Sequence, residues 1–262
     1  MAEDYSTGKD TAAEENEMSF LDHLEELRWR IIKAIIGIVV GAVICGIFID
    51  WIMNYFLLAP AMSTSPPLVL INLKPYGQLV LYMEVVLVGG IIISVPNIFY
   101  QFWKFIEPGL LVSERRYISW IVFFSTFCFL GGVAFAYFVM LPTALKFFAA
   151  FGTQAISNNI AVNEYFSFVI SVMITAGVVF ELPMVSFFLS KVGILTPAFM
   201  RKYRKHAVVI ILLLAGILTP GPDITSQLLL GIPLVILYEI SILICKYSQK
   251  KESGELTNEQ TA

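Results

Sequence analysis

Two carboxylates lie among arginines at the border of an apolar stretch. Residues 23–30, with the sequence HLEELRWR, run directly into the first long apolar stretch of the chain. Borders of this kind usually carry plain Lys and Arg, so Glu25 and Glu26 are unusual there. A carboxylate can accept two parallel N–H bonds from a guanidinium group. The segment is therefore a candidate binding site for a cationic partner at a membrane surface.

The same segment has a simpler interpretation as a self-contained helix. Ser19 and Asp22 fit a capping box, so a helix is expected to begin near Ser19. It would be amphipathic and lie at the membrane interface before it turns into the membrane. Glu26 and Arg30 stand four residues apart and could pair with each other. On this segment alone, the internal pair is favoured over a binding site. The apolar face would carry Phe20, Leu24, Leu27 and Ile31.

A second border segment repeats the pattern of acid, arginine and aromatic residues. Residues 100–110 are rich in aromatic side chains and lead to the sequence SERR at 113–116. Two carboxylate patches on one membrane face could accept the guanidinium groups of a visiting peptide. Alternatively, Ser113 caps a helix and Glu114 is stabilised by the helix dipole. The two roles of Glu114 are compatible.

Glu181 is the only charged residue between Glu164 and Lys191, inside an apolar stretch. An ionised carboxylate that faces lipid costs roughly 2.5–3.5 kcal/mol. We therefore expect Glu181 to face protein or water, and a functional role is favoured over a structural hydrogen bond. Glu84 is a similar residue nearer the end of an earlier stretch. Prolines are expected to kink three of the helices: Pro96, Pro183 and Pro233.

The composition is that of a membrane protein. The 262 residues are 58% hydrophobic and 14% charged, whereas soluble domains have about 25% charged residues. A span needs about 20 apolar residues. We predict an all-α polytopic membrane protein with helices 5 and 6 short, accommodated either by a locally thinned bilayer or by flanking side chains that extend to the interface. The six predicted transmembrane helices are 28–52, 76–104, 117–141, 163–189, 204–219 and 224–245.

Lys and Arg residues predict the orientation. Nearly all of them fall on one side of the predicted spans, whereas Lys74 and Lys146 fall on the other. By the positive-inside rule both termini are cytoplasmic. Residues 1–18 are an acidic, disordered tail, 19–248 the transmembrane domain and 249–262 a polar cytoplasmic tail. Of the outside loops, 53–75 is proline-rich and predicts a folded, non-helical cap, and 142–162 opens with Pro142, which favours a short surface helix.

Signatures of enzymes are missing from the sequence. We find no phosphate-binding loop, no H-E-x-x-H and no G-x-S-x-G, so we predict no catalytic residues and no cofactor. With only two histidines and no metal-type cysteine spacing, a metal site is not expected. Cys45, Cys128 and Cys245 are expected to be buried, inert thiols. Any work that the protein performs must then draw on a partner or on the transmembrane potential.

Several longer motifs resemble one family over roughly residues 18–248. The chain is similar to TatC, the multispanning receptor of the twin-arginine protein translocase. The matching segments are HLEELRWR (23–30), AP (59–60), SVPNIFYQFWKFIEPGL (94–110), SERR (113–116), FAYF (135–138), FELP (180–183), LTPGPD with SQ (218–227), and IP with YEI (232–240).

The resemblance implies a glove-like, concave bundle in the cytoplasmic (inner) membrane of a prokaryote. Such proteins bind twin-arginine signal peptides and export folded proteins with single-span TatA/TatB-type partners. They form oligomers, use the proton motive force and bind no nucleic acid. Glu84, where the family usually has a basic residue, and the inserted Gly221 depart from the family pattern. By position, the signal-peptide site falls on Glu26, Glu114, Arg28, Arg30, Gln101, Phe105 and Arg116, the intramembrane acid on Glu181, and outer-side functional residues on Pro60, Asp223 and Gln227.

Other functions remain open from the residues alone. Glu181 would also suit a proton-coupled transporter of small solutes, because an intramembrane carboxylate can carry a proton. A passive structural scaffold is a third hypothesis. A translocase receptor is favoured because both acid patches and the family motifs point to it.

Overall fold

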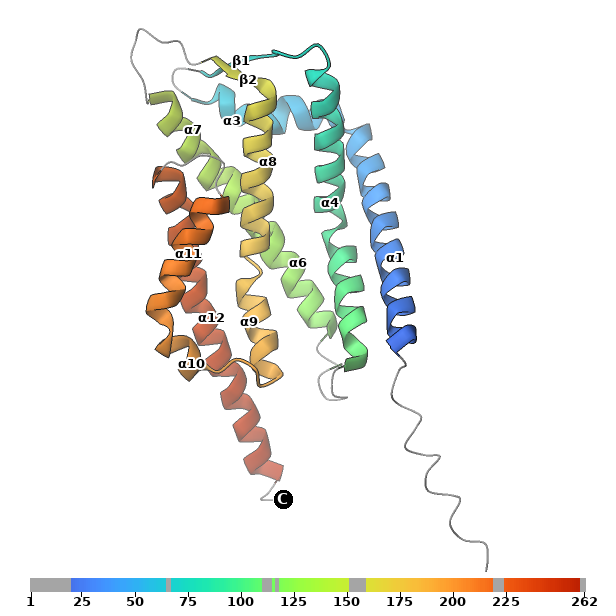
Figure 1. The fold of residues 1–262 in the computed structure, drawn as a ribbon, viewed down its shortest axis with the longest axis vertical. Helices are drawn as coiled ribbons and strands as arrows, with labels where there is room; N and C mark the ends of the chain where they lie inside the picture. Colours follow the sequence, from blue (N-terminus) through green and yellow to red (C-terminus); the bar gives the residue numbers. More distant parts are fainter. Residues whose placement is uncertain are drawn as a thin grey trace, which may run out of the picture.

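Long helices run side by side and are closed at one end by a small cap (Figure 1). The structure is a computed structural model, which describes residues 20–64, 67–109, 115, 118–150, 159–218 and 224–259. We call the end with α3 and the strands the cap end, and the opposite end, where the chain enters α1, the base end. The C-terminal end of α12 also lies at the base end.

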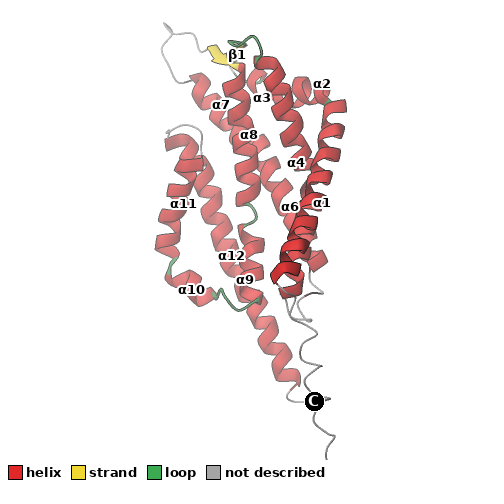
Figure 2. Ribbon diagram, turned by 45° about the vertical axis from the view of Figure 1, so that its right-hand side comes forward, coloured by secondary structure: helices red, strands yellow, loops and turns green. Residues whose placement is uncertain are grey.

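Helices account for most of the described chain, and only one small sheet is present among these residues (Figure 2). The elements are α1 (Phe20–Ile47), α2 (Ile49–Trp51), the π-helix η1 (Ile52–Leu57), α3 (Ala59–Met62), β1 (Val69–Ile71), α4 (Gly77–Ile106), the 3-10 helix η2 (Glu107–Gly109), α6 (Ile118–Phe135), the π-helix η3 (Ala136–Met140), α7 (Leu141–Ala150), β2 (Asn159–Ala161), α8 (Val162–Val179), α9 (Leu182–Lys191), α10 (Pro197–Lys202), α11 (Arg204–Leu218) and α12 (Ile224–Glu259).

Five stretches are long and apolar enough to cross a membrane. The remaining predicted span corresponds to α11, whose 15 residues extend about 22 Å, against a hydrocarbon core near 30 Å. Helix ends differ from the prediction at both termini: the first helix begins at Phe20, and the last continues to Glu259 rather than ending at 245. The five stretches are Asp22–Ile47, Gly77–Ile106, Ile118–Ala150, Val162–Lys191 and Leu230–Tyr247.

The predicted interfacial helix before the first span is not a separate element. α1 continues without interruption from Phe20 to Ile47, because this stretch contains no proline. On its apolar face, Leu24 and Ile31 are about half exposed, as expected for side chains that contact lipid. On its polar face, Glu26 and Arg30 are largely buried, whereas the remaining polar-face residues are exposed.

Small residues let α1 and α4 approach closely. A Cβ atom added at Gly41 would lie 2.6 Å from the Gly90 carbonyl oxygen. The Ser94 hydroxyl donates a hydrogen bond to the Gly37 carbonyl at 2.6 Å, and Asn97 Nδ2 donates to the Lys33 carbonyl at 3.2 Å. Close packing of small residues with interhelical hydrogen bonds is the usual basis of helix association in membranes. These contacts fix α1 against the half of α4 that leads to the base end.

The predicted kink at Pro183 is a complete break. α8 ends at Val179 and α9 begins at Leu182, and the two are joined by Phe180 and Glu181. Proline has no N–H to bond with the preceding turn, so the helical ladder cannot continue through it. Pro96 and Pro233, by contrast, lie inside continuous helices.

The cap contains more helix than its prolines predict. Residues 52–62 form η1 and α3, so the prediction of a non-helical cap over 53–75 was wrong in this part. Pro60 is the second residue of α3, where its missing N–H costs nothing. β1 and β2 pair in parallel, with Val69 opposite Asn159. Residues after Pro142 are helical, as predicted, but Pro142 does not begin a separate surface helix: α7 continues directly from η3 within the single stretch Ile118–Ala150.

Two tyrosines attach the cap to the spans. The Tyr137 hydroxyl donates to the Phe56 carbonyl at 2.9 Å, and the Tyr165 hydroxyl donates to the Leu57 carbonyl at 2.8 Å. The Tyr137 ring also stacks on Phe56 with a centroid separation of 4.0 Å. Because a π-helix does not make the regular α-helical hydrogen bonds, η1 offers carbonyls that these hydroxyls can reach.

Candidate functional site

An ion pair at the base end links Glu26 to Arg30. Arg30 Nη2 and Nε donate to the same oxygen, Glu26 Oε1, at 2.9 and 3.2 Å. Both side chains are about four-fifths buried, with 23% and 19% exposed for Arg30 and Glu26. The internal i,i+4 pair expected from the sequence is therefore present.

The pair is connected to α4 through a buried amide. Arg30 Nη1 donates to Gln101 Oε1 at 3.4 Å, and Gln101 Nε2 donates to Asn97 Oδ1 at 3.4 Å. Asn97 in turn binds the backbone of α1 at Lys33. A single line of polar contacts thus runs from Glu26 through Arg30 and Gln101 to the α1–α4 interface. This line holds the Glu26 carboxylate in one position relative to α4.

Only one oxygen of Glu26 is used by these contacts. Oε2 accepts no hydrogen bond from any described residue, so it is available to a ligand donor. A guanidinium or an N–H group that reaches it would make a charge-assisted bond, which is the stronger kind. The Arg30 pair is therefore compatible with ligand binding, because it orients the carboxylate and leaves one oxygen free.

Phe105 lies next to this polar line, and Arg28 does not. The His23 ring stacks on Phe105, with centroids 4.4 Å apart, so the aromatic side chain joins the first turns of α1 to the end of α4. Arg28 is exposed and has no hydrogen bond or ion pair with the described residues. Contacts thus join Glu26, Arg30 and Gln101, and Phe105 is attached to the same helix α1 through His23, while Arg28 is exposed on that helix.

The second acid patch falls largely outside the described residues. Glu114 and Arg116 both do so, and their position relative to Glu26 stays a prediction. Arg115 is described, and its Nη2 donates to the Pro108 carbonyl at 3.2 Å. Next to it, Lys104 pairs with Glu107 at 2.7 Å. Charged side chains therefore continue from the end of α4 into η2.

Glu181 faces protein, as expected for an intramembrane carboxylate. It lies at the break between α8 and α9, where the Ser125 side chain and the Phe129 backbone of α6 are its neighbours. Its Oε1 atom is buried and has no hydrogen-bond partner among the described residues. An incompletely bonded carboxylate oxygen inside a membrane protein is unusual. A functional role for this residue remains a prediction.

The predicted outer-side residues have contacts within the fold. Pro60 is buried, and its carbonyl accepts a hydrogen bond from the Ser63 hydroxyl at 2.9 Å. Gln227 Nε2 donates to the Leu212 carbonyl at 2.9 Å and so ties α12 to α11. Asp223 lies outside the described residues. Neither described residue belongs to the base-end site.

Two α4 residues that donate hydrogen bonds to the backbone of α1 were missed by the sequence reasoning. Ser94 and Asn97 stand three residues apart, with Gln101 four residues further on. Such spacing places all three on one face of the helix. Polar residues at this period in an apolar helix were the available signal for a packing interface.

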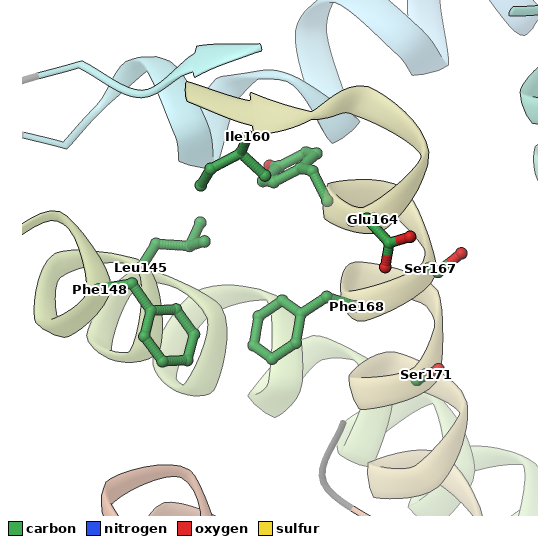
Figure 3. A pocket seen from close by; sticks show the side chains of 8 residues that line it. Leu145, Phe148, Ile160, Glu164, Ser167, Phe168 and Ser171 are labelled. Carbon is green, nitrogen blue, oxygen red and sulfur yellow. The ribbon is translucent and has the colours of Figure 1, made fainter. Parts of the chain in front are cut away.

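A separate pocket of about 270 Å³ lies at the cap end, between α7 and α8 (Figure 3). Its walls are mostly apolar, with Phe148 and Phe168 in edge-to-face contact at 5.7 Å. Glu164 and two serines of α8 also line it. The pocket lies at the opposite end from Glu26 and has no part in the candidate site.

Among the residues that the structure describes, no group of three or more His, Cys, Asp or Glu side chains could hold a metal ion. Cys45 and Cys245 are buried, as expected, whereas Cys128 is only half-buried.

The fold and site together define a multi-span helical membrane protein with a charged, aromatic patch at one end. Comparison with known proteins makes this class more specific. A model of the family "Sec-independent protein translocase protein (TatC)" matches residues 22–233. This match spans most of the chain, which therefore belongs to the TatC family.

Relatives agree over nearly their full length. The TatC protein of Carboxydothermus hydrogenoformans is 40% identical over 243 residues, covering 92% of this chain and 99% of the relative. The TatC protein of Aquifex aeolicus is 38% identical over 237 residues, with 90% and 98% covered. A crystal structure of a twin arginine translocase receptor, TatC, is 38% identical and superposes with a TM-score of 0.76, covering 87% of this chain and 99% of that one.

Proposed function

We propose that this protein is the receptor and core translocase subunit of a twin-arginine translocation system. It binds twin-arginine signal peptides at the base end and exports folded proteins together with single-span TatA/TatB-type subunits, in an oligomer of its own. The observation that carries the proposal is the largely buried Glu26 carboxylate, held by Arg30, which is in turn held by Gln101, with one Glu26 oxygen unused.

In this proposal the base end is cytoplasmic and the cap end faces outward. Most Lys and Arg side chains of the described chain lie towards the base end, which fits the positive-inside rule. The chain then spans the inner membrane of a bacterium with both termini inside. Lacking a nucleotide-binding motif, it draws on the proton motive force, and Glu181 is the residue best placed to respond to it.

Recognition of arginine follows from the chemistry of the site. The planar guanidinium group offers donors in a fixed fork, whereas the Lys ammonium is a compact point charge. A carboxylate with one oxygen already bound by Arg30 accepts a further donor at the other oxygen. Glu114 would supply the second carboxylate, so that two adjacent arginines of a peptide are each met by one acid. Arg28 and Arg30 disfavour binding of a cation that pairs with neither carboxylate, because like charges repel.

A binding titration tests the proposed site. Purified protein in nanodiscs is titrated with a labelled twin-arginine peptide and with the same peptide carrying two lysines. Glu26→Gln should weaken arginine-peptide binding by roughly 10- to 100-fold, since loss of a charge-assisted bond costs about 1.5–3 kcal/mol. The matched control is Glu25→Gln, which removes the same charge from an exposed neighbour. Equal affinity of the Glu26→Gln and Glu25→Gln proteins would rule out the site.

A proton-coupled transporter of small solutes is the second candidate. The incompletely bonded Glu181 favours it, because such a carboxylate can exchange a proton. Reconstituted vesicles distinguish the two functions: solute uptake that requires Glu181 and no partner subunit supports the transporter. Export of a folded twin-arginine substrate that is lost in the Glu26→Gln/Glu114→Gln protein supports the receptor and rejects the passive scaffold.

A further inference from the structure

A short helix at the base end is fixed firmly to the bundle. α10 is capped by Thr196, whose hydroxyl oxygen accepts a hydrogen bond from the Phe199 N–H at 3.2 Å. Met200 is buried against α12, and its carbonyl accepts a bond from the Tyr238 hydroxyl at 2.8 Å. The position of α10 is therefore set by one face, and the opposite face is free to meet the surroundings.

That free face and the start of α11 carry a dense group of cations. Residues 201–206 are all exposed. Arg204 is neutralised by Glu239, with Nε 2.8 Å from Oε1. The other cations have no ion pair with any described residue, and no other acid side chain in the described chain is paired with this segment. They are Arg201, Lys202 and Lys205, with His206 beside them.

A shallow, open depression lies beside these charges on one face of α11, and we call it the groove. It has a volume of about 370 Å³ and is lined by Lys205, His206, Val209 and Ile210 of this single helix. Further along α11, two exposed leucines, Leu213 and Leu214, continue the apolar stripe that Val209 and Ile210 begin. The groove therefore has a cationic mouth and an apolar floor that continues along α11.

We propose that this groove binds an anionic phospholipid. Its phosphate lies at the first turn of α11, beside Lys205 and near Lys202, and an acyl chain follows Val209 and Ile210. Basic pockets next to membrane-spanning helices bind acidic headgroups in this way. The site is separate from the one proposed for signal peptides.

The first turn of α11 strengthens the preference for an anion. A helix of 15 residues presents free N–H groups and the positive end of its dipole at its start. Lys205 belongs to this first turn, so its charge and the free N–H groups lie at the same end of the helix. A zwitterionic lipid would place its ammonium group among like charges, which is unfavourable.

The length of α11 gives a second reason for a bound lipid. At about 22 Å, α11 is shorter than the hydrocarbon core, so as the predicted fifth span it would require a thinner bilayer beside it or headgroups drawn inward. A lipid held by its phosphate at Lys205 would place its headgroup at the level where this helix begins. Hydrophobic mismatch and charge therefore favour the same occupant.

Native mass spectrometry of the full-length protein tests the proposal. Delipidated protein is titrated separately with phosphatidylglycerol and with phosphatidylethanolamine of the same chains. We expect tighter retention of phosphatidylglycerol. Each lysine near an acidic headgroup contributes about fivefold in affinity, so Lys202→Gln/Lys205→Gln should weaken it by roughly 30-fold. Val209→Trp fills the groove without changing the charge and should also reduce retention.

The matched control is Lys33→Gln/Lys246→Gln. It removes the same two charges from exposed positions at the base end that line no described pocket. Equal retention of the two lipids by the unaltered protein, or an equal loss in the control variant, would refute the proposal. A photoreactive residue at position 210 that captures a protein instead of lipid in membranes would also refute it, and would assign the groove to a partner helix. Signal-peptide binding is not measured, so the result is independent of the proposed function.

Discussion

Replacing Gly41 by valine places a side chain where α1 and α4 have no room for one. The new Cβ would lie 2.6 Å from the Gly90 carbonyl oxygen and 2.7 Å from Ser94 Oγ. Ordinary van der Waals contact begins near 3.4 Å, so the helices must separate by about 0.8 Å, the difference between 3.4 and 2.6 Å. The neighbouring atom is main chain, and no rotamer change can relieve the contact.

The separation also weakens hydrogen bonds that hold the candidate site. Lengthening by about 0.8 Å would stretch the Ser94–Gly37 bond from 2.6 to about 3.4 Å, and the Arg30–Gln101 contact, already 3.4 Å, beyond bonding distance. Overpacking costs about 1–3 kcal/mol, and an interhelical hydrogen bond in a membrane contributes about 0.6 kcal/mol. Together we expect a loss of about 2–4 kcal/mol.

Thermal unfolding in detergent and signal-peptide titration measure the two consequences. The expected loss corresponds to a melting temperature lower by roughly 5–10 °C. Peptide affinity should fall by roughly three- to tenfold, because Glu26 is no longer held against α4. The control is Gly131→Val in α6, where an added Cβ meets no atom within 4 Å. If Gly41→Val unfolds and binds like the Gly131→Val protein, the close packing of α1 on α4 does not position the site, and this reasoning is wrong.

Three further changes should have effects of different size. Gln101→Leu removes the amide that joins Arg30 to Asn97. It should reduce signal-peptide affinity about fivefold, because a lost hydrogen bond is worth about 1 kcal/mol. Unchanged affinity would exclude Gln101 from the site. Tyr165→Phe leaves the Leu57 carbonyl without its 2.8 Å partner and should lower the melting temperature by roughly 2–6 °C, whereas the exposed Tyr247→Phe should not. Glu239→Gln removes the surface ion pair with Arg204. It should change the melting temperature by no more than about 2 °C, because exposed pairs contribute little. A larger drop would mean that α11 depends on this pair.

Features that depend on one segment were predictable from the sequence. The apolar stretches fixed most span positions to within several residues, and the missing N–H of Pro183 predicted a kink close to the point where α8 and α9 separate. The Glu26–Arg30 pair followed from their spacing of four residues, since helical geometry alone brings them together. α10 was missed, although Thr196 followed by Pro197 is a recognisable helix start.

Features that depend on two distant segments were not predictable. The contact between Arg30 and Gln101 joins residues 71 apart in the sequence, and only the packing of α1 on α4 decides it. η1 was missed for the same reason, because its free carbonyls are bonded by Tyr137 and Tyr165 from other helices. The sequence was enough to propose Glu26 as a ligand group, but it could not predict that Oε2 is the oxygen that remains available.

The hydrogen bonds between α4 and α1 also bear on how this pair can vary in evolution. Ser94 and Asn97 donate to main-chain carbonyls of Gly37 and Lys33, which every residue type possesses. The axial register of α1 is therefore encoded in the side chains of α4 and in the small size of the α1 contact residues. A change of side chain at position 33 leaves the register intact, whereas a change at Asn97 lets α1 slide. Drift in α1 is tolerated on its lipid-facing side, while α4 carries the constraint for both helices.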